Sequence, residues 1–419
     1  MLRKLTSIML AAIPLCTVAC NNATPEKLTN YVDTSIGTGG HGHVFVGASV
    51  PFGMVQLGPT SIPTSWDWCS GYHESDNSVV GFSHTHLSGT GIGDLFDVTL
   101  MPVTGSAYSY SREGIAGSAD RSQEKSVPGY YSVPLEGSGI LCEMTATARV
   151  GLSRFTFPEG ADSPAIVLNL QNGGCWDELT DGDITITDGS HLTGHRFSKG
   201  WADDQKLYFA AEFSKEFSAS EAAADGFWKF SFPEGGQVLV KVALSPTSTE
   251  AALANLAEEM PGWDFEGTCK AADEAWEKEL AKVHVETADK DARTIFYTAL
   301  YHTMIAPALF SDCGQPNRYT TFSLWDTYRA AMPLFSILHP EKENDIMGTF
   351  IDIYDKQGKL PVWHLHGCET NCMVGNPGIP VVADAILKGF DGFDVERAYE
   401  AMKVSALRPD RGQDLRMKY

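Results

Sequence analysis

The sequence predicts a mixed, multidomain protein in which an antiparallel β-sandwich is followed by a helical region. Short apolar runs cut by Gly, Pro, Asp and Ser fill residues 31 to about 245, a texture typical of sandwich strands. From Ser248 onward, helix-forming residues with apolar positions at helical spacing take over. The chain has 419 residues, enough for two or three domains.

The strand predictions define a first domain at residues 27–247. Each predicted strand is a short apolar run bounded by turn-forming residues. The clearest runs are 130–135, 148–157, 165–170, 184–189, 207–213 and 237–244. Alternation of such runs with Gly, Pro, Asp and Ser indicates strands joined by turns, as in an antiparallel sandwich.

The helix predictions divide the rest of the chain into a linker at 248–288 and a helical domain at 289–419. The linker begins with a Ser or Thr cap and holds predicted helices at 248–260 and 268–283. Periodicity predicts about five helices after residue 290. The clearest of these are 291–307, 379–390 and 395–407.

The N-terminus reads as a secretory signal at residues 1–20. Arg3 and Lys4 precede an apolar stretch, and the small residue Ala19 stands directly before Cys20. This pattern predicts a bacterial lipoprotein anchored through a lipidated Cys20, in the periplasm or at the outer membrane; plain cleavage is the alternative. No later apolar run reaches the ~18 residues that would indicate a membrane span.

Charge and cysteine content narrow the classes of partner and of stabilising bond. The net charge of −22 argues against nucleic acid or anionic lipid as partner, because both require a basic face. Seven cysteines follow Cys20, and an odd number gives no tidy disulfide framework. They are Cys69, Cys142, Cys175, Cys269, Cys313, Cys368 and Cys372.

Four polar, aromatic and Gly-rich segments interrupt the predicted framework, at 37–59, 66–97, 320–335 and 360–380. Each combines aromatic residues with carboxylates, histidines or amides. Sugar sites need this mixture, because aromatic faces stack on pyranose rings and planar polar groups bind the hydroxyls. The segments therefore predict a carbohydrate site.

Two His-x-His pairs stand in these segments, His41/His43 and His84/His86. In an extended chain, residues i and i+2 point the same way, so each pair could bind zinc. No third ligand lies at an established spacing. Hydrogen bonding to a substrate or interface, and structural packing, are the alternatives.

Two carboxylates are the candidate chemical groups. Asp326, in WDTYR, could bind substrate or simply favour a helix N-terminus. Glu369 stands between Cys368 and Cys372, and a buried apolar loop would favour the protonated carboxyl that a general acid requires. A buried, satisfied Glu is the alternative.

Five motifs in their order and spacing resemble glycoside hydrolase family 92, the bacterial exo-acting α-mannosidases. The resemblance extends from about Tyr31 to the last residue. The motifs are GTGGHGHVFVGASVPFGMVQLGP (37–59), WCSGYHESD (68–76), GFSHTHLSGTG (81–91), TFSLWDTYRAAMPLF (321–335) and GCETNCMVG (367–375).

The resemblance implies a β-sandwich packed on an (α/α)6 barrel whose first part is 289–419, with the active site at their junction. It further implies an inverting, calcium-dependent hydrolase that removes terminal mannose from N-glycans or mannans, with α-1,2 linkages the first choice. Glu369 matches the general acid, and Trp325 and Asp326 match the mannose-binding segment. Further substrate contacts are expected from Trp68, His84, His86, His41, His43 and Asn371; the metal ligands are not assigned.

The chain also departs from the family in two ways. Gly375-Asn376-Pro377 stands where many members read Gly-Tyr-His, which bears on the leaving-group side and on linkage. Members are longer, and their catalytic-base aspartates lie well past the acid. The chain is therefore expected to be a truncated fragment, inactive alone. The alternative function is a non-catalytic, glycan-binding lipoprotein.

Overall fold

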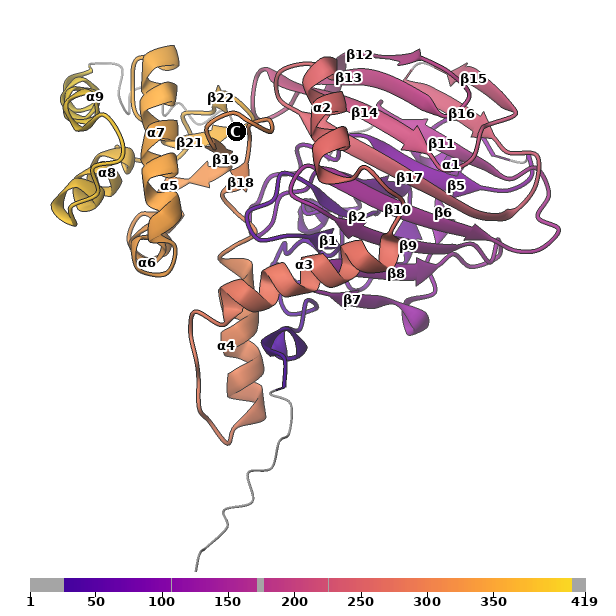
Figure 1. The fold of residues 1–419 in the computed structure, drawn as a ribbon, viewed down its shortest axis with the longest axis horizontal. Coiled ribbons are helices and arrows are strands. Elements are labelled where there is room, and N and C mark those ends of the chain that lie inside the picture. The colour runs from indigo at the N-terminus through magenta and orange to yellow at the C-terminus, as the bar shows by residue number, and fades with distance from the viewer. Residues whose placement is uncertain (1–25, 107, 172–176, 225, 409–419) are drawn as a thin grey trace, which may run out of the picture.

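The computed structural model describes residues 26–106, 108–171, 177–224 and 226–408 (Figure 1). A sheet-rich N-terminal part is followed by a helical part, so the predicted order of fold classes is confirmed. The predicted signal peptide, its Cys20 and also Cys175 lie outside the described residues. Within the described ranges, no helix combines the length and apolar character needed to span a membrane.

Two antiparallel sheets form the N-terminal part (Figure 1). In spatial order, the first holds β1 (Ala48–Ser49), β2 (Gln56–Thr60), β4 (Gly81–Ser83), β5 (Thr99–Val103), β11 (Ala165–Asn169), β16 (Phe227–Ser231) and β15 (Ala219–Ala224). The second holds β12 (Glu178–Ile186), β13 (His191–Lys199), β14 (Gln205–Phe213), β17 (Gly236–Ser245), β10 (Val150–Phe157), β9 (Leu141–Ala146), β8 (Tyr130–Pro134) and β7 (Lys125–Val127).

Strand β10 explains how the sheets are held. Successive side chains of a strand point to opposite faces, and β10 is apolar on both. Phe155 faces the first sheet, where its ring centroid lies 6.1 Å from that of Phe82. Val150 and Leu152 face the other way and pack against Ala252 and Leu256 of the first linker helix. The second sheet therefore forms the middle layer, between the first sheet and the linker.

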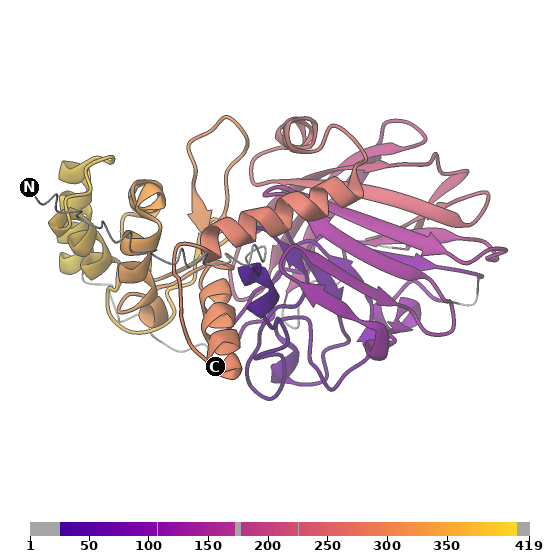
Figure 2. The same cartoon turned by 60° about the horizontal axis from the view of Figure 1, so that its bottom comes forward.

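The linker consists of two helices, α2 (Thr249–Glu259) and α3 (Phe265–Leu280). The predicted cap is confirmed, because the side chain of Ser248 accepts a hydrogen bond from the Ala251 N–H. Helix α3 runs across the sandwich toward the helical part (Figure 2). Its buried Trp276 donates to the Ser49 carbonyl at 2.7 Å. The linker is therefore packed on the sandwich.

The helical part contains five longer helices and one single turn in the described residues. These are α4 (Lys290–His302), α5 (Leu324–Thr327), α6 (Ala331–Leu338), α7 (Pro340–Gln357), α8 (Gly378–Leu387) and α9 (Val395–Leu407). Short strands lie between them: β18 (Ala308–Leu309) with β19 (Tyr319–Thr320), and β20 (Phe322–Ser323), β21 (Trp363–Leu365) and β22 (Cys368–Glu369). Minor elements complete the sandwich part: η1 (Leu28–Tyr31), η2 (Trp66–Trp68), β3 (Ser78–Val79), α1 (Arg112–Ile115), β6 (Gly117–Ser118) and η3 (Arg121–Gln123).

Backbone hydrogen bonds join the two parts at Phe52. Its N–H donates to the Met304 carbonyl at 2.7 Å, and its carbonyl accepts from Leu309 at 2.8 Å. The Phe52 ring also meets Phe335 of α6 edge to face, with centroids 5.7 Å apart. These contacts fix the segment that follows α4 against the sandwich. The strands β18 to β22 are thereby held beside the sandwich loops.

Candidate active site

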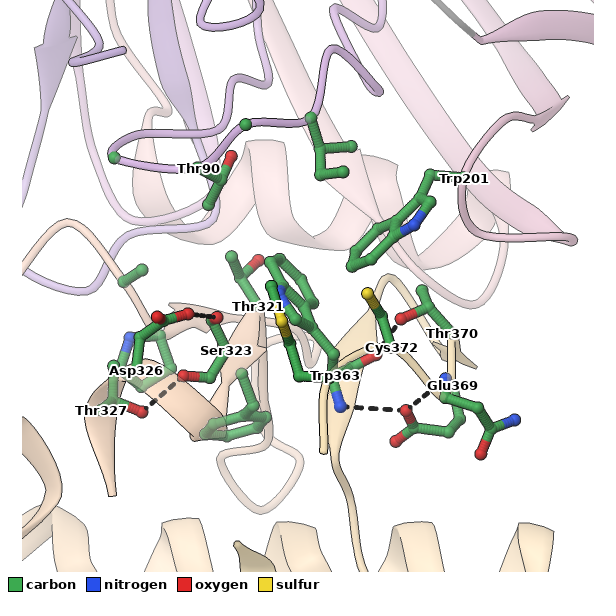
Figure 3. Close-up of a pocket in the computed structure, with 18 of the residues that line it drawn as sticks. Thr90, Trp201, Thr321, Ser323, Asp326, Thr327, Trp363, Glu369, Thr370 and Cys372 are labelled. Carbon is green, nitrogen blue, oxygen red and sulfur yellow. Dashed lines mark hydrogen bonds between the residues drawn. The ribbon is translucent and has the colours of Figure 1, made fainter. Parts of the chain in front are cut away.

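A cleft of about 1510 Å³ opens between the sandwich and the helical part. One wall consists of sandwich loops at 88–92 and 199–203, together with Trp66. The other consists of Thr321, Phe322, Ser323, Asp326, Thr327 and residues 369–374, with Trp363 beneath them. In Figure 3, Thr90 and Trp201 face the second wall from the sandwich side. The cleft therefore takes its walls from both parts of the chain.

The small sheet of β20, β21 and β22 places Glu369 on the second wall. In its register, His364 lies opposite Glu369 and Ser323 lies opposite Trp363. The Glu369 carboxylate accepts hydrogen bonds from the Val362 and Trp363 N–H groups, both at 2.9 Å, and from Asn371 N–H at 2.8 Å. Glu369 is half-buried and held by polar donors, which differs from the buried apolar loop expected from the sequence.

Asp326 lines the same wall, at the first turn of α5. The Ser323 hydroxyl donates to its carboxylate, and Figure 3 shows both side chains toward one end of the cleft. The neighbouring Trp325 is 45% exposed and is not among the residues that line the cleft. Of this predicted pair, the structure thus brings Asp326 to the cleft.

Asn371 also lies on this wall, in the left-handed region with a φ of 53°. Asn tolerates this conformation better than most residues. Its buried Oδ1 has no hydrogen-bond partner within the described part of the chain. The carbonyl oxygen is therefore a buried acceptor that the described residues leave without a partner.

The two tryptophans at 66 and 68 have different places. Trp68 stacks on His73, with centroids 4.3 Å apart, and donates to Asp76 at 2.7 Å. Trp66 lines the cleft, is 50% exposed, and donates to the Gly91 carbonyl at 3.0 Å. Trp68 was expected to contact the substrate, whereas the structure brings Trp66 to the cleft. Two tryptophans so close in one segment carry no sequence signal that separates them.

His41 and His43 meet Asp67 behind Trp66. His41 Nδ1 lies 2.6 Å and His43 Nε2 lies 3.3 Å from the same Asp67 oxygen. The hydrogen bond from His41 lowers the pKa of Asp67. The His43 ring also meets Trp66 edge to face at 4.2 Å. This cluster supports the cleft wall from the side.

The glycines of this loop allow its close path. The Gly37 backbone has a φ of +90°, a conformation that favours glycine. At Gly42, a Cβ atom would lie 2.0 Å from the Gly37 carbonyl oxygen. The loop can therefore fold back on itself and bring both histidines to Asp67.

His84 and His86 lie inside the sandwich. Their Nδ1 atoms contact the Val98 and Gln56 carbonyls at 2.6 and 2.7 Å. Burial lowers the pKa of each to about 4. Neither residue lines the cleft, so this placement corrects the expectation of substrate contact and favours the packing alternative.

Two clusters among the described residues have the residue types of a metal site. The first, His41, His43 and Asp67, offers two imidazoles and suits zinc better than calcium, which prefers oxygen. The second, Glu279, His339 and Glu341, contains the Lys282 ammonium, 2.8 Å from Glu279 and 2.9 Å from Glu341. A cation already satisfies those carboxylates. Neither cluster fits calcium.

Several cleft residues were not predicted. Trp201 lies in the turn after β13, outside the four segments singled out, and its ring contacts that of Trp363 in the fourth segment (Figure 3). Asn376, at the departure from the family pattern, donates instead to the Ser405 carbonyl at 2.9 Å. The sequence signal that could have indicated Trp201 was the Gly200-Trp201 pair in a turn between two strands.

Comparisons with known proteins agree with this architecture. Residues 31–245 match the model of the glycosyl hydrolase family 92 N-terminal domain, and residues 251–418 match that of the family's catalytic domain. The chain is 35% identical to the family GH92 α-mannosidase BT3965 from Bacteroides thetaiotaomicron, with a TM-score of 0.85 over 92% of this chain and 58% of that one. A second structure of that protein contains mannoimidazole.

Two further relatives cover similar shares. The inverting mannosidase BT2199 from Bacteroides thetaiotaomicron is 26% identical, with a TM-score of 0.79 over 90% of this chain and 55% of that one. A protein named as an uncharacterized secreted glycosidase, from Arthroderma benhamiae, is 28% identical over 89% of this chain and 51% of its own length. The chain thus spans between half and three fifths of the lengths of these relatives.

Proposed function

Because this chain belongs to glycosyl hydrolase family 92, we propose that it forms the acid-bearing part of an inverting exo-α-mannosidase. The observation that carries the proposal is the cleft between the sandwich and the helical part. Its second wall presents two carboxylates, Asp326 and Glu369, opposite the aromatic residues Trp66 and Trp201. Stacking surfaces and planar acceptors are the groups that a hexose site needs.

The carboxylates have separate proposed roles. Glu369 is the general acid that protonates the leaving oxygen, and its three backbone donors hold it in place. Asp326 binds hydroxyls of the terminal mannose, with Trp66 as a stacking surface. Inversion also requires a base, roughly 6.5–9.5 Å from the acid. We assign no residue to that base.

The test uses the protein produced from its complete gene and the variant Glu369→Gln. An acid contributes most when the leaving group is poor, so turnover of α-1,2-mannobiose should fall by about 10²–10⁴-fold. Turnover of 2,4-dinitrophenyl α-mannoside, whose leaving group needs little protonation, should fall far less. Proton NMR of the first product should show β-mannose, the inverted anomer.

Glu396→Gln, on the exposed first turn of α9, is the matched control and should leave both rates unchanged. An equal loss on both substrates would remove Glu369 from the acid role, and α-mannose as first product would exclude inversion. Mannose binding by the wild-type protein without any turnover would assign the alternative function, glycan binding without hydrolysis.

The finer specificity is also proposed. The substrate is a terminal mannose of N-glycans or mannans, and release from α-1,2-mannobiose should exceed release from its α-1,3 and α-1,6 isomers. Calcium dependence is a proposal for the whole enzyme, since neither cluster of the described residues fits that ion. EDTA should abolish turnover and added Ca²⁺ restore it, and indifference to EDTA would refute the requirement.

The proposed location is the cell envelope. Arg3, Lys4 and the Ala19-Cys20 pair support a lipoprotein signal with Cys20 as the lipidated residue. The Arthroderma benhamiae relative is named as secreted, which is consistent with export of this chain. Lipid modification would place the cleft outside the cytoplasm, where mannose-containing glycans are found as partners.

A further inference from the structure

A turn of the sandwich, residues 200–204 between β13 and β14, carries Trp201 into the cleft (Figure 3). The ring of Trp201 meets that of Trp363 edge to face, with centroids 4.7 Å apart and an angle of 89°. Trp363 is only 2% exposed, whereas Trp201 is half-buried. Trp201 is therefore the member of the pair that a ligand can reach.

The position of Trp201 along the cleft indicates which sugar it meets. In Figure 3, Ser323 and Asp326 lie toward one end, while Glu369 and Cys372 lie toward the other, below Trp201. The acid is linked to this pair, because the Trp363 whose ring Trp201 contacts donates its backbone N–H to Glu369 at 2.9 Å. A ring beside Trp201 would lie past the acid, away from Asp326.

We propose that Trp201 is the stacking platform for the sugar on the leaving-group side of the bond, and that Asp94 positions it. This inference rests on the proposed function, because it uses Glu369 as the acid and Asp326 as the terminal-mannose end. Exposed Lys199 and Asp203 line the cleft on either side of Trp201. They supply a donor and an acceptor for the hydroxyls of a second hexose.

Asp94 supports this turn from below. It is fully buried, and its Oδ2 accepts hydrogen bonds from the Ala202 N–H at 3.1 Å and from Gln205 Nε2 at 2.7 Å. Ala202 follows Trp201 directly, so the bond fixes the backbone that carries the ring. A Cβ on Gly200 would lie 2.6 Å from the Asp94 carboxylate oxygens. Glycine there allows the turn to rest on the carboxylate.

The test measures sugar binding by calorimetry, with every protein carrying Glu369→Gln so that no substrate is consumed. The probes are methyl α-mannoside, which fills only the terminal site, and methyl α-1,2-mannobioside, which fills both. Loss of one aromatic contact should weaken disaccharide binding by W201A about 5- to 10-fold. The affinity for methyl α-mannoside should change less than twofold.

Trp201→Phe should keep most of the disaccharide affinity, which separates loss of the platform from loss of the fold. Asp94→Ala should weaken the disaccharide selectively, and Asp94→Asn, which keeps an acceptor oxygen, should restore much of the affinity. Trp228→Ala is the matched control, because Trp228 lies on β16 of the sandwich and not in the cleft; both affinities should be unchanged.

Two results would overturn the inference: an equal loss of both affinities in W201A, or no loss of either. Equal loss would place Trp201 at the terminal mannose instead. A selective loss in W228A as large as that in W201A would also contradict it. If the parent protein binds neither sugar, the failure belongs to the proposed function on which the inference rests.

Discussion

Arg196 offers the sharpest test of how the cleft is supported, because it is a buried cation held by two buried carboxylates. Its guanidinium donates to Asp97 at 2.6 Å, to Asp177 at 2.8 Å and to the Leu170 carbonyl at 2.8 Å. The three side chains are 0%, 4% and 0% exposed. Asp177 in turn accepts from the N–H of Leu95, the residue that follows Asp94. The network thus connects the sandwich core to the turn that carries Trp201.

Arg196→Met keeps much of the side-chain volume but leaves both carboxylates without their cation. Breaking a buried ion pair on one side costs about 3–5 kcal/mol, because the remaining charge is left uncompensated. For a domain of this size, each kcal/mol lowers the unfolding midpoint by about 2–4 °C. We therefore expect the thermal midpoint of the sandwich to fall by about 6–20 °C.

The assay is thermal unfolding followed by circular dichroism in the β-sheet band. Arg112→Met is the matched control: Arg112 pairs with Glu113 at the surface, where both are partly exposed, and an exposed pair contributes at most about 1 kcal/mol. Adding Asp97→Asn and Asp177→Asn to R196M removes the two carboxylate charges left without a cation, and should restore part of the lost thermal midpoint. An R196M midpoint within 2 °C of wild type, or no recovery in the triple variant, would refute the reasoning.

Two further predictions concern pH and export. Burial raises the pKa of Glu343 from 4.5 to about 7, with Lys388 acting to lower it. The folded state therefore keeps a proton that the unfolded state loses, and the free energy of unfolding should fall as pH rises from 4.5 to 7. Glu343→Gln should reduce this pH-dependent decrease in the free energy of unfolding by up to about 3 kcal/mol, and thermal midpoints at pH 5 and 8 measure it. The same pH dependence in the variant and the wild type would contradict this. Cys20→Ser should abolish incorporation of labelled palmitate into the protein in its host. Labelling that persists in the variant would show that the lipid is attached to another residue.

The sequence was sufficient where structure follows from local patterns. Helix periodicity predicted 395–407, and α9 spans Val395–Leu407. The Ser248 cap was also correct, because a cap bonds within its own first turn. The strand predicted at 184–189 begins instead at Glu178 and ends at Ile186. That strand lies at a sheet edge with mostly exposed residues, so its apolar signal is weak.

Contacts between distant segments explain what the sequence missed. Strand β21 pairs with β20 and with β22 over only two residue pairs each. A strand of three residues is too short for an alternating apolar pattern to show in the sequence. The prediction of substrate contact for His84 and His86 failed for another reason. In the sequence, the His84/His86 pair has the same His-x-His spacing as the His41/His43 pair. Sheet pairing buries His84 and His86 inside the sandwich, whereas His43 contacts Trp66 at the cleft wall.

By itself, the amino-acid sequence determined the order of sheet and helix, the starts of helices α2, α4, α8 and α9 to within one residue, and the set of segments rich in aromatic and carboxylate groups. These depend on residue spacing and on bonds within one turn or strand. Only the tertiary structure decided that Trp66 rather than Trp68 lines the cleft, that Trp201 lies opposite Glu369, and that Asp94 holds it there. Those facts depend on how the sandwich packs against the helical part, because the two walls of the cleft come from segments more than a hundred positions apart in the sequence.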